Sequence, residues 1–219
     1  MTTTHDTATH EGGHHDTPEQ RDKKELSALI LLIAGDGLFL VLEILTWFYL
    51  RALNPNHGWR FSTASPTNPA TSGSNNPHDI TAEVAKAPVS WSLLVILATL
   101  AVGGLVWFGE MRSRKGESPV PALGLALLTG LVAIGLQVYQ FQTLPFQTTD
   151  GTYASCFEFF MASNLAHQFL ALIVVLGVWN RGRKNLYARN WYQLRLARIW
   201  TMWVGISALL LGAVSILFV

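Results

Sequence analysis

The chain has 219 residues, of which 50% are hydrophobic and only 13% are charged. An ordinary soluble domain carries about 25% charged residues, so this composition excludes a soluble domain as the main part of the chain. The formal net charge of +1 excludes little, whereas a single cysteine, Cys156, excludes an intrachain disulfide and any Cys-x-x-Cys metal or haem site.

The N-terminal segment is polar and rich in threonine and histidine, and it lacks the apolar run of a cleavable signal peptide. A segment with so little apolar surface does not offset the entropy lost on ordering. We therefore expect residues 1–25 to form a disordered cytoplasmic tail. A solubilising role is the better interpretation of this tail, although weak metal binding is open to its histidines, His5, His10, His14 and His15.

Five apolar runs follow the tail, each long enough to cross a bilayer core about 30 Å thick, which takes about 20 helical residues. They predict an all-α, polytopic membrane protein in which residues 26–219 form a bundle of five transmembrane helices. The expected helices cover approximately residues 26–50, 89–109, 121–141, 156–180 and 199–219. The Pro-, Ser- and Asn-rich segment 62–79 predicts a loosely packed loop between the first two helices.

The placement of positive charge predicts an orientation. Three segments hold 12 of the 15 Lys and Arg residues: one precedes the first helix, one follows the second, and one lies between the fourth and fifth. With five spans, all three segments lie on one side of the membrane. The positive-inside rule then places the N-terminus in the cytoplasm and the C-terminus outside.

Aromatic and small residues within the spans have ordinary structural interpretations. Aromatic residues near predicted helix ends are typical of the belts found at membrane interfaces, and we expect Trp47, Trp107 and Trp179 to anchor their helices there. Small residues allow neighbouring helices to approach closely. Those in a position to do so are Gly103, Gly104, Gly130 and Gly135.

Two carboxylates, Asp36 and Glu43, lie inside the first apolar run. At 100° per residue their spacing of seven leaves them about 20° apart, so they share one helix face. Burying either as an isolated ion in lipid costs about 2.5–3.5 kcal/mol on insertion scales. We expect this face to point into protein or water, where at least one carboxyl can be protonated at neutral pH. The pattern leaves open whether Glu43 joins the polar seam of Asp36 or reaches outer-leaflet water.

Polar side chains recur in the third and fourth predicted helices. Gln137 and Gln140 share a face at the end of the third helix. Asn164 and His167 share a face of the fourth, and we expect His167 to hydrogen-bond a neighbouring helix. Glu158 points the opposite way, near the outer end. We interpret these five residues as an internal polar network, and we expect no catalytic or metal centre because no ligand or nucleophile spacing is visible.

Residues 137–181 resemble subunit III of cytochrome c oxidase. In that family a helix ends in Q-x-x-E-Y, a P-F turn follows, and D-G-x-Y-x-S opens a helix whose histidine comes fourteen residues after the tyrosine. The positions of this chain that fall in that register are Gln137, Phe141, Pro145, Phe146, Asp150, Gly151, Tyr153, Ser155 and His167.

The first helix adds a second similarity, in which a small residue and an intramembrane acid precede an aromatic-rich helix end. Here the small residue is Gly35, the acid is Asp36, and the helix end finishes near Arg51. The resemblance covers residues 26–219, in the five-helix bacterial form of the family.

The chain also departs from the family pattern. Gln140 stands in place of the usual glutamate, Asn164 in place of a frequent histidine, and Asp36 in place of the usual glutamate. The segment "YQLRLARIW" lacks the usual H-F-V-D-like motif, and Glu43 has no usual counterpart.

The resemblance implies an accessory, non-redox subunit of a respiratory haem-copper terminal oxidase in the bacterial cytoplasmic (inner) membrane. Its direct partner would be the catalytic subunit I. Further partners would be subunit II and either small subunits or a respiratory supercomplex. Haem and copper would lie on those partners, while this chain would bind phospholipid and support proton uptake and stable turnover during proton-pumping O2 reduction.

Site residues follow from the same resemblance. Asp36, with Glu43 as a second candidate, would face subunit I, and His167 would be an internal polar strut. Lipid phosphates are candidate ligands for three arginines at the inner helix ends, although interfacial anchoring is the better interpretation. These are Arg181, Arg195 and Arg198.

Two other functions compete with this one. The first is the homologous companion subunit of a nitric oxide reductase, which only the identity of the partner would distinguish. The second is a small independent proton channel or transporter that uses Asp36, Glu43 and His167 as a relay. Inverted repeats or broken helices would favour a transporter, and neither is visible in the sequence.

Overall fold

Five long α-helices make up nearly all of the chain that the computed structural model describes, which is residues 17–54, 59, 86–187 and 191–218. A short 3₁₀ helix, η2 (Thr148–Asp150), precedes the fourth. The helices are α1 (Pro18–Leu53), α2 (Val89–Arg114), α3 (Val120–Gln142), α4 (Thr152–Arg183) and α5 (Tyr192–Leu217). All five are long and apolar enough to cross a membrane. The predicted fold class, an all-α protein with five transmembrane helices, is confirmed.

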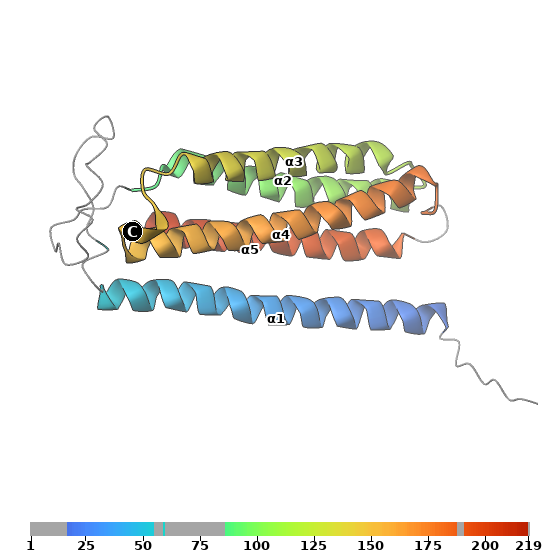
Figure 1. The fold of residues 1–219 in the computed structure, drawn as a ribbon. Coiled ribbons are helices and arrows are strands. Elements are labelled where there is room, and N and C mark those ends of the chain that lie inside the picture. The colour runs from blue at the N-terminus through green and yellow to red at the C-terminus, as the bar shows by residue number, and fades with distance from the viewer. Residues whose placement is uncertain (1–16, 55–58, 60–85, 188–190, 219) are drawn as a thin grey trace, which may run out of the picture.

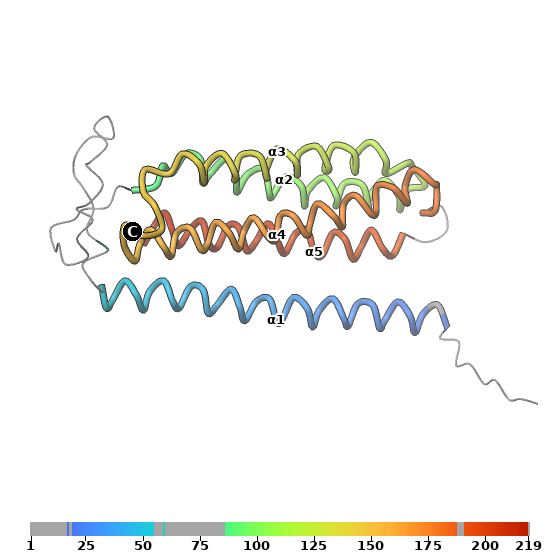
Figure 2. Tube along the Cα trace, viewed as in Figure 1, coloured from blue at the N-terminus to red at the C-terminus, as the bar shows by residue number. Residues whose placement is uncertain are grey.

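Helices α2 to α5 form a four-helix bundle, and α1 runs along its outside (Figure 1). In the bundle α2 packs on α3 and α5, and α4 packs on α3 and α5. Helix α1 packs only on α4 and α5 among the described helices with substantial contacts, and the tube view shows it lying alone beside them (Figure 2). Among the described helices, the main contacts that hold α1 therefore come from α4 and α5.

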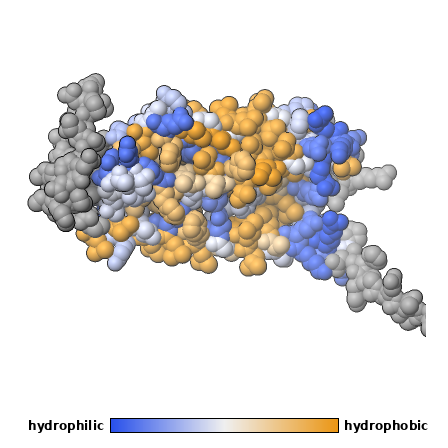
Figure 3. Space-filling model, viewed as in Figure 1, coloured by the Kyte–Doolittle hydropathy of each residue, from blue (hydrophilic) through white to orange (hydrophobic). Residues whose placement is uncertain are grey.

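The two ends of the molecule are polar and its middle is apolar (Figure 3). The start of α1, the α2–α3 turn and the α4–α5 connection all lie at the same end (Figure 1). The three basic segments of the sequence are thus at one end of the helices, whereas Arg51 and Lys86 lie at the other. This is the charge distribution of a multi-pass membrane protein.

Helix α1 begins at Pro18, eight residues before its expected start at residue 26. A capping box explains the early start: the Thr17 hydroxyl accepts from the Gln20 N–H at 3.3 Å, and the Gln20 side chain accepts from the Thr17 N–H at 3.0 Å. Proline is favoured at the first helical position, and an Arg21–Glu25 ion pair at 3.0 Å supports the first turns.

The expected disorder of residues 1–25 is therefore wrong for residues 18–25, which are helical because their own polar side chains cap and pair them. Residues 1–16 and the expected loop 62–79 lie outside the described residues. The other predicted helices lie within or close to the observed ones, most of which continue further at their polar ends.

Trp47 is not an interfacial anchor, because it is fully buried. Its ring stacks on Phe160 at 5.1 Å between centroids and meets Tyr153 and Trp59 edge to face at 5.7 and 5.4 Å. Its indole N–H donates to the backbone carbonyl of Phe218 at 3.3 Å. The expectation for Trp47 was wrong since this position falls on the face of α1 that packs on the bundle. Trp47 instead connects α1 with the N-terminal part of α4 and with the C-terminal end of α5.

Glycine allows α2 and α5 to approach closely at one point. A Cβ atom at Gly103 would lie 3.2 Å from the carbonyl oxygen of Thr201 on α5. Gly130 is similarly close to a side chain of α4, whereas Gly104 and Gly135 have no neighbour within 4 Å. The predicted close approach is confirmed for the first two glycines and wrong for the last two.

We predict that Gly103→Val will lower the free energy of unfolding by about 1–3 kcal/mol, because the added methyl groups push against the backbone of α5. Gly104→Val is the matched control, with an expected change of about 0.5 kcal/mol or less. Both can be measured by denaturant titration of the protein in mixed micelles. Equal losses in the two variants would contradict the close approach of α2 and α5.

Candidate functional site: polar contacts inside the membrane-spanning helices

The face of α1 that packs on the bundle has residues spaced alternately by three and four. Those that are buried or half-buried in this series are Leu29, Ile33, Asp36, Leu40, Glu43, Trp47 and Leu50. This is the spacing of a coiled-coil seam, so both carboxylates stand in line with apolar residues. The side chain of Asp36 is 18% exposed and Glu43 is 3% exposed, which confirms that their shared face points into the protein.

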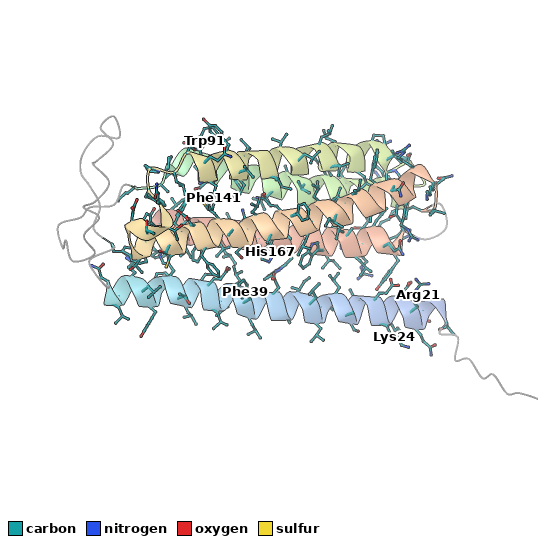
Figure 4. All side chains as sticks on the ribbon, viewed as in Figure 1. Arg21, Lys24, Phe39, Trp91, Phe141 and His167 are labelled. Carbon is teal, nitrogen blue, oxygen red and sulfur yellow. The ribbon has the colours of Figure 1, made fainter. Side chains whose placement is uncertain are left out.

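Asp36 connects α1 with two other helices. Its Oδ1 lies 2.8 Å from Nε2 of His167 on α4, and its Oδ2 accepts a hydrogen bond from Nε1–H of Trp203 on α5 at 2.5 Å. Figure 4 shows His167 in the space between α4 and α1. The expected hydrogen bond from His167 to a neighbouring helix is confirmed, and its partner is Asp36.

The Asp36–His167 contact requires a shared proton. Nδ1 of His167 lies 2.7 Å from the Ser163 carbonyl oxygen, which only accepts, so Nδ1 carries a hydrogen. A hydrogen bond between Nε2 and Oδ1 then needs one further hydrogen, held either by the imidazole or by the carboxyl. Both arrangements leave the pair without net charge. The pair therefore holds one proton between two helices without burying an uncompensated charge.

Glu43 is a buried acid with no hydrogen bond of ordinary geometry. Neither of its carboxyl oxygens makes such a bond to a residue in the described ranges, although the Ser163 hydroxyl of α4 lies close enough to interact with the carboxyl. None of the ion pairs found among the described residues includes it. Since an unpaired buried carboxylate is costly, we infer that Glu43 is the neutral acid. It belongs to the same seam as Asp36 and is buried away from the molecular surface.

A second polar cluster lies inside the four-helix bundle. Asn164 on α4 donates to Gln137 on α3 at 2.7 Å, Gln137 donates to Gln140 at 3.2 Å, and Gln140 donates to Ser92 on α2 at 2.9 Å. Asn164 and His167 therefore serve different neighbours, because the 60° between them on the helix wheel directs one to α3 and the other to α1.

Glu158 belongs to neither cluster. It lies near the start of α4, where it accepts a hydrogen bond from the Thr148 hydroxyl of η2. The five residues expected to form one network thus divide into three groups. Gln137, Gln140 and Asn164 are connected, His167 pairs with Asp36, and Glu158 lies near the N-terminal end of α4.

A third polar cluster, at the basic end of the bundle, was not predicted. Glu110 of α2 is fully buried and lies 2.6 Å from Nη2 of Arg114 and 3.1 Å from Nε of Arg198 on α5. Arg198, expected at lipid headgroups, therefore has an internal counter-ion. Arg181 is exposed at the end of α4 and Arg195 is half-buried on α5, and lipid binding by these arginines stays a prediction.

Tyr187 lies in the turn after α4 and is buried in the same apolar cluster as Leu194 and Ala197 of α5. Burial raises the pKa of its phenol to about 12, although the positive charge of Arg181 opposes the shift. Tyr187 is therefore neutral at physiological pH and packs as an apolar side chain where α4 meets α5.

Sequence reasoning did not identify Glu110, Trp203 or Ser92 as polar partners. The spacing of Glu110 and Arg114, four apart on a helix, was a signal that could have indicated their pairing. Trp203 and Ser92 carry no such signal, because a tryptophan or serine in an apolar helix gives no indication of its partner.

No protein-family model matches this chain, and no curated protein is found to match it. In the part of the chain that the structure describes, no group of three or more His, Cys, Asp or Glu side chains is placed to hold a metal ion. The functional interpretation therefore depends on the polar contacts above and on the resemblance of the sequence to one family.

We predict different effects for two substitutions at Asp36. Asp36→Ala leaves Nε2 of His167 and Nε1 of Trp203 without partners and should lower the free energy of unfolding by about 2–4 kcal/mol. Asp36→Asn keeps both contacts, since the amide donates to a neutral imidazole and its oxygen accepts from Trp203, and should cost about 1 kcal/mol or less. Unfolding titrations of both variants test this, and equal losses would contradict the bonded arrangement.

Glu43→Leu is predicted to stabilise the protein by about 1–3 kcal/mol, because it replaces an unpaired buried acid with an apolar side chain of similar size. The matched control is Glu158→Leu, which removes a bonded carboxyl at a helix end and should give no gain. The same unfolding titration serves for both. A loss of stability in Glu43→Leu would show that Glu43 has a partner in the folded protein.

Proposed function

We propose that this chain is an accessory, non-redox subunit of a respiratory haem-copper terminal oxidase, of the subunit III type found in cytochrome c oxidases. The observation that carries the proposal is the 2.8 Å contact between Asp36 and His167. These residues come from two separate stretches of sequence, and each stretch resembles the family independently. Each stretch supplies one of the two partners of this polar contact, and this supports the resemblance.

A second contact also joins the two stretches. Tyr153, which follows the D-G turn of the family pattern, is buried and packs against Trp47 of the aromatic end of α1 at 5.7 Å. Phe146, from the P-F turn, packs on Tyr153 at 5.6 Å. Tyr153 and Phe146 therefore belong both to the sequence pattern that resembles the family and to the apolar packing between α1 and α4.

In this proposal the chain docks on the catalytic subunit I, with subunit II as a further partner, and binds phospholipid. Haem and copper belong to the partner subunits. Both oxygens of Asp36 are bonded to His167 and Trp203, so Asp36 supports docking by fixing the position of α1. The proton held by the Asp36–His167 pair, and the neutral acid Glu43 beside it, are the groups through which the chain would support proton uptake.

The proposal includes an orientation and a location. The end that carries the three basic segments faces the cytoplasm of a bacterium, and the C-terminus of α5 faces outside, by the positive-inside rule. The membrane is the bacterial inner membrane, where respiratory oxidases work.

Co-purification tests the proposal. The tagged full-length chain is extracted from its native membranes in mild detergent, and we predict that it will carry a larger polypeptide with haem absorption and oxygen-reducing activity. Untagged membranes are the control. A partner that reduces nitric oxide, or a chain that purifies alone and conducts protons in liposomes, would replace this proposal with one of the competing functions.

The Asp36 variants separate docking from proton support in the same preparation. Asp36→Ala should lower the amount of co-purified haem several-fold, since a destabilisation of about 1.4 kcal/mol corresponds to about tenfold in an equilibrium. Asp36→Asn should retain the haem but slow proton uptake, because it keeps the contacts and removes the titratable group. Complete loss of oxygen reduction with an intact complex would instead indicate a direct catalytic role.

A further inference from the structure

A small cavity that is partly open to the surface lies among the helices of the four-helix bundle and has polar groups on its wall. Its volume is about 40 Å³, and it is bordered by residues of α2, α3, α4 and α5. Its wall contains no charged side chain. The polar residues that line it are Ser92, Gln137, Gln140, Asn164 and Ser215, and the rest of the wall is apolar or glycine.

Four of these residues form a chain of hydrogen bonds that all run in one direction. Asn164 donates to Gln137, Gln137 donates to Gln140, and Gln140 donates to the Ser92 hydroxyl. The chain crosses from α4 through α3 to α2, and every member borders the cavity.

Both ends of this hydrogen-bond chain are incomplete. At one end, Oδ1 of Asn164 is buried and has no hydrogen-bond partner in the described part of the protein, and the residue is 8% exposed. At the other end, the Ser92 hydroxyl accepts from Gln140, and no acceptor for its own hydrogen is found among the described residues. An unsatisfied acceptor at such a site costs about 1–3 kcal/mol. The cavity therefore borders both a missing donor and a missing acceptor.

We propose that this cavity is a water-binding site, in which bound water accepts from Ser92 and donates to Asn164 and so closes the hydrogen-bond chain into a ring. A buried water needs about 10–15 Å³ of such volume and two to four polar partners, so a cavity of about 40 Å³ has room for about three to four molecules. The ligand is neutral because no counter-charge lines the wall, and burying an ion there would be costly. Water is small enough and both donates and accepts.

A second cavity in the bundle differs from the first mainly in its size. It lies among α2 to α5 and has a volume of about 10 Å³, and its wall contains three polar residues, Thr99, Gln168 and Thr201, among apolar residues and glycine. Gln168 donates to Thr99 at 3.0 Å, while its own Oε1, like Oδ1 of Asn164, has no hydrogen-bond partner in the described part of the protein. This cavity is at or below the size of one water, so Gln168 provides a matched control.

Radiolytic labelling tests the proposal in the full-length chain. Brief X-ray exposure produces hydroxyl radicals from water, and radicals formed at bound water oxidise the side chains that touch it. Met161 borders the cavity and is only 5% exposed. We predict rapid oxidation of Met161, read by mass spectrometry, at a rate similar to that of Met111, which is 40% exposed at the basic end of α2.

Two variants remove the water in different ways. Asn164→Leu removes the unpartnered oxygen, and Ala208→Leu fills the cavity from α5. Each should slow Met161 oxidation about fivefold or more, as expected if a site for about three to four waters is lost. Gln168→Leu, a similar change on α4, should leave the rate unchanged.

Slow oxidation of Met161 in the unsubstituted protein would overturn the proposal, because it would show that the cavity is dry. Fast oxidation that persists in Ala208→Leu would also overturn it, since the radicals would then come from elsewhere. If Asn164→Leu does not fold, Ala208→Leu decides alone, because it leaves every polar group of the ring in place.

Discussion

A polar group that is left unpaired inside a membrane is costly, and this cost determines how the helices of this protein are connected. Asp36 is bonded by α4 and α5, Glu110 is neutralised by two arginines, and Asn164 reaches α3. Apolar packing alone does not distinguish one neighbour from another within lipid, since lipid tails are as apolar as leucine. The polar contacts therefore specify which helices pair and how the paired helices are aligned along their axes.

Glu43 is the exception to this rule. It lies two turns from Asp36 on the same seam, yet neither of its oxygens makes a hydrogen bond of ordinary geometry to the described residues. Burying a neutral carboxylic acid at that position costs less free energy than burying a carboxylate, and burying leucine would cost less still. Natural sequences retain residues that cost stability mainly where activity needs them. Glu43 is consequently the residue whose presence folding explains least.

Periodicity and the cost of burial predicted much of this structure. They gave the five spans, the shared face of Asp36 and Glu43, and a helix partner for His167. They did not give Trp203 as the second partner of Asp36, because periodicity places a residue at an angle on its own helix and leaves the neighbouring helix unknown. The inward position of Trp47 was missed for the same reason. The early start of α1 could have been recognised from its capping box.

The seam of α1 repeats every seven residues, and this repeat has a consequence for assembly. A slide of α1 by two turns, about 10.5 Å, would bring Glu43 opposite His167 in the place of Asp36, so the carboxyls alone do not define the alignment. The same slide would force the indole of Trp47 into the space of Leu40 and break its bond to the Phe218 carbonyl. A large ring at one end of the helix thus removes an ambiguity that two similar acids create in its middle.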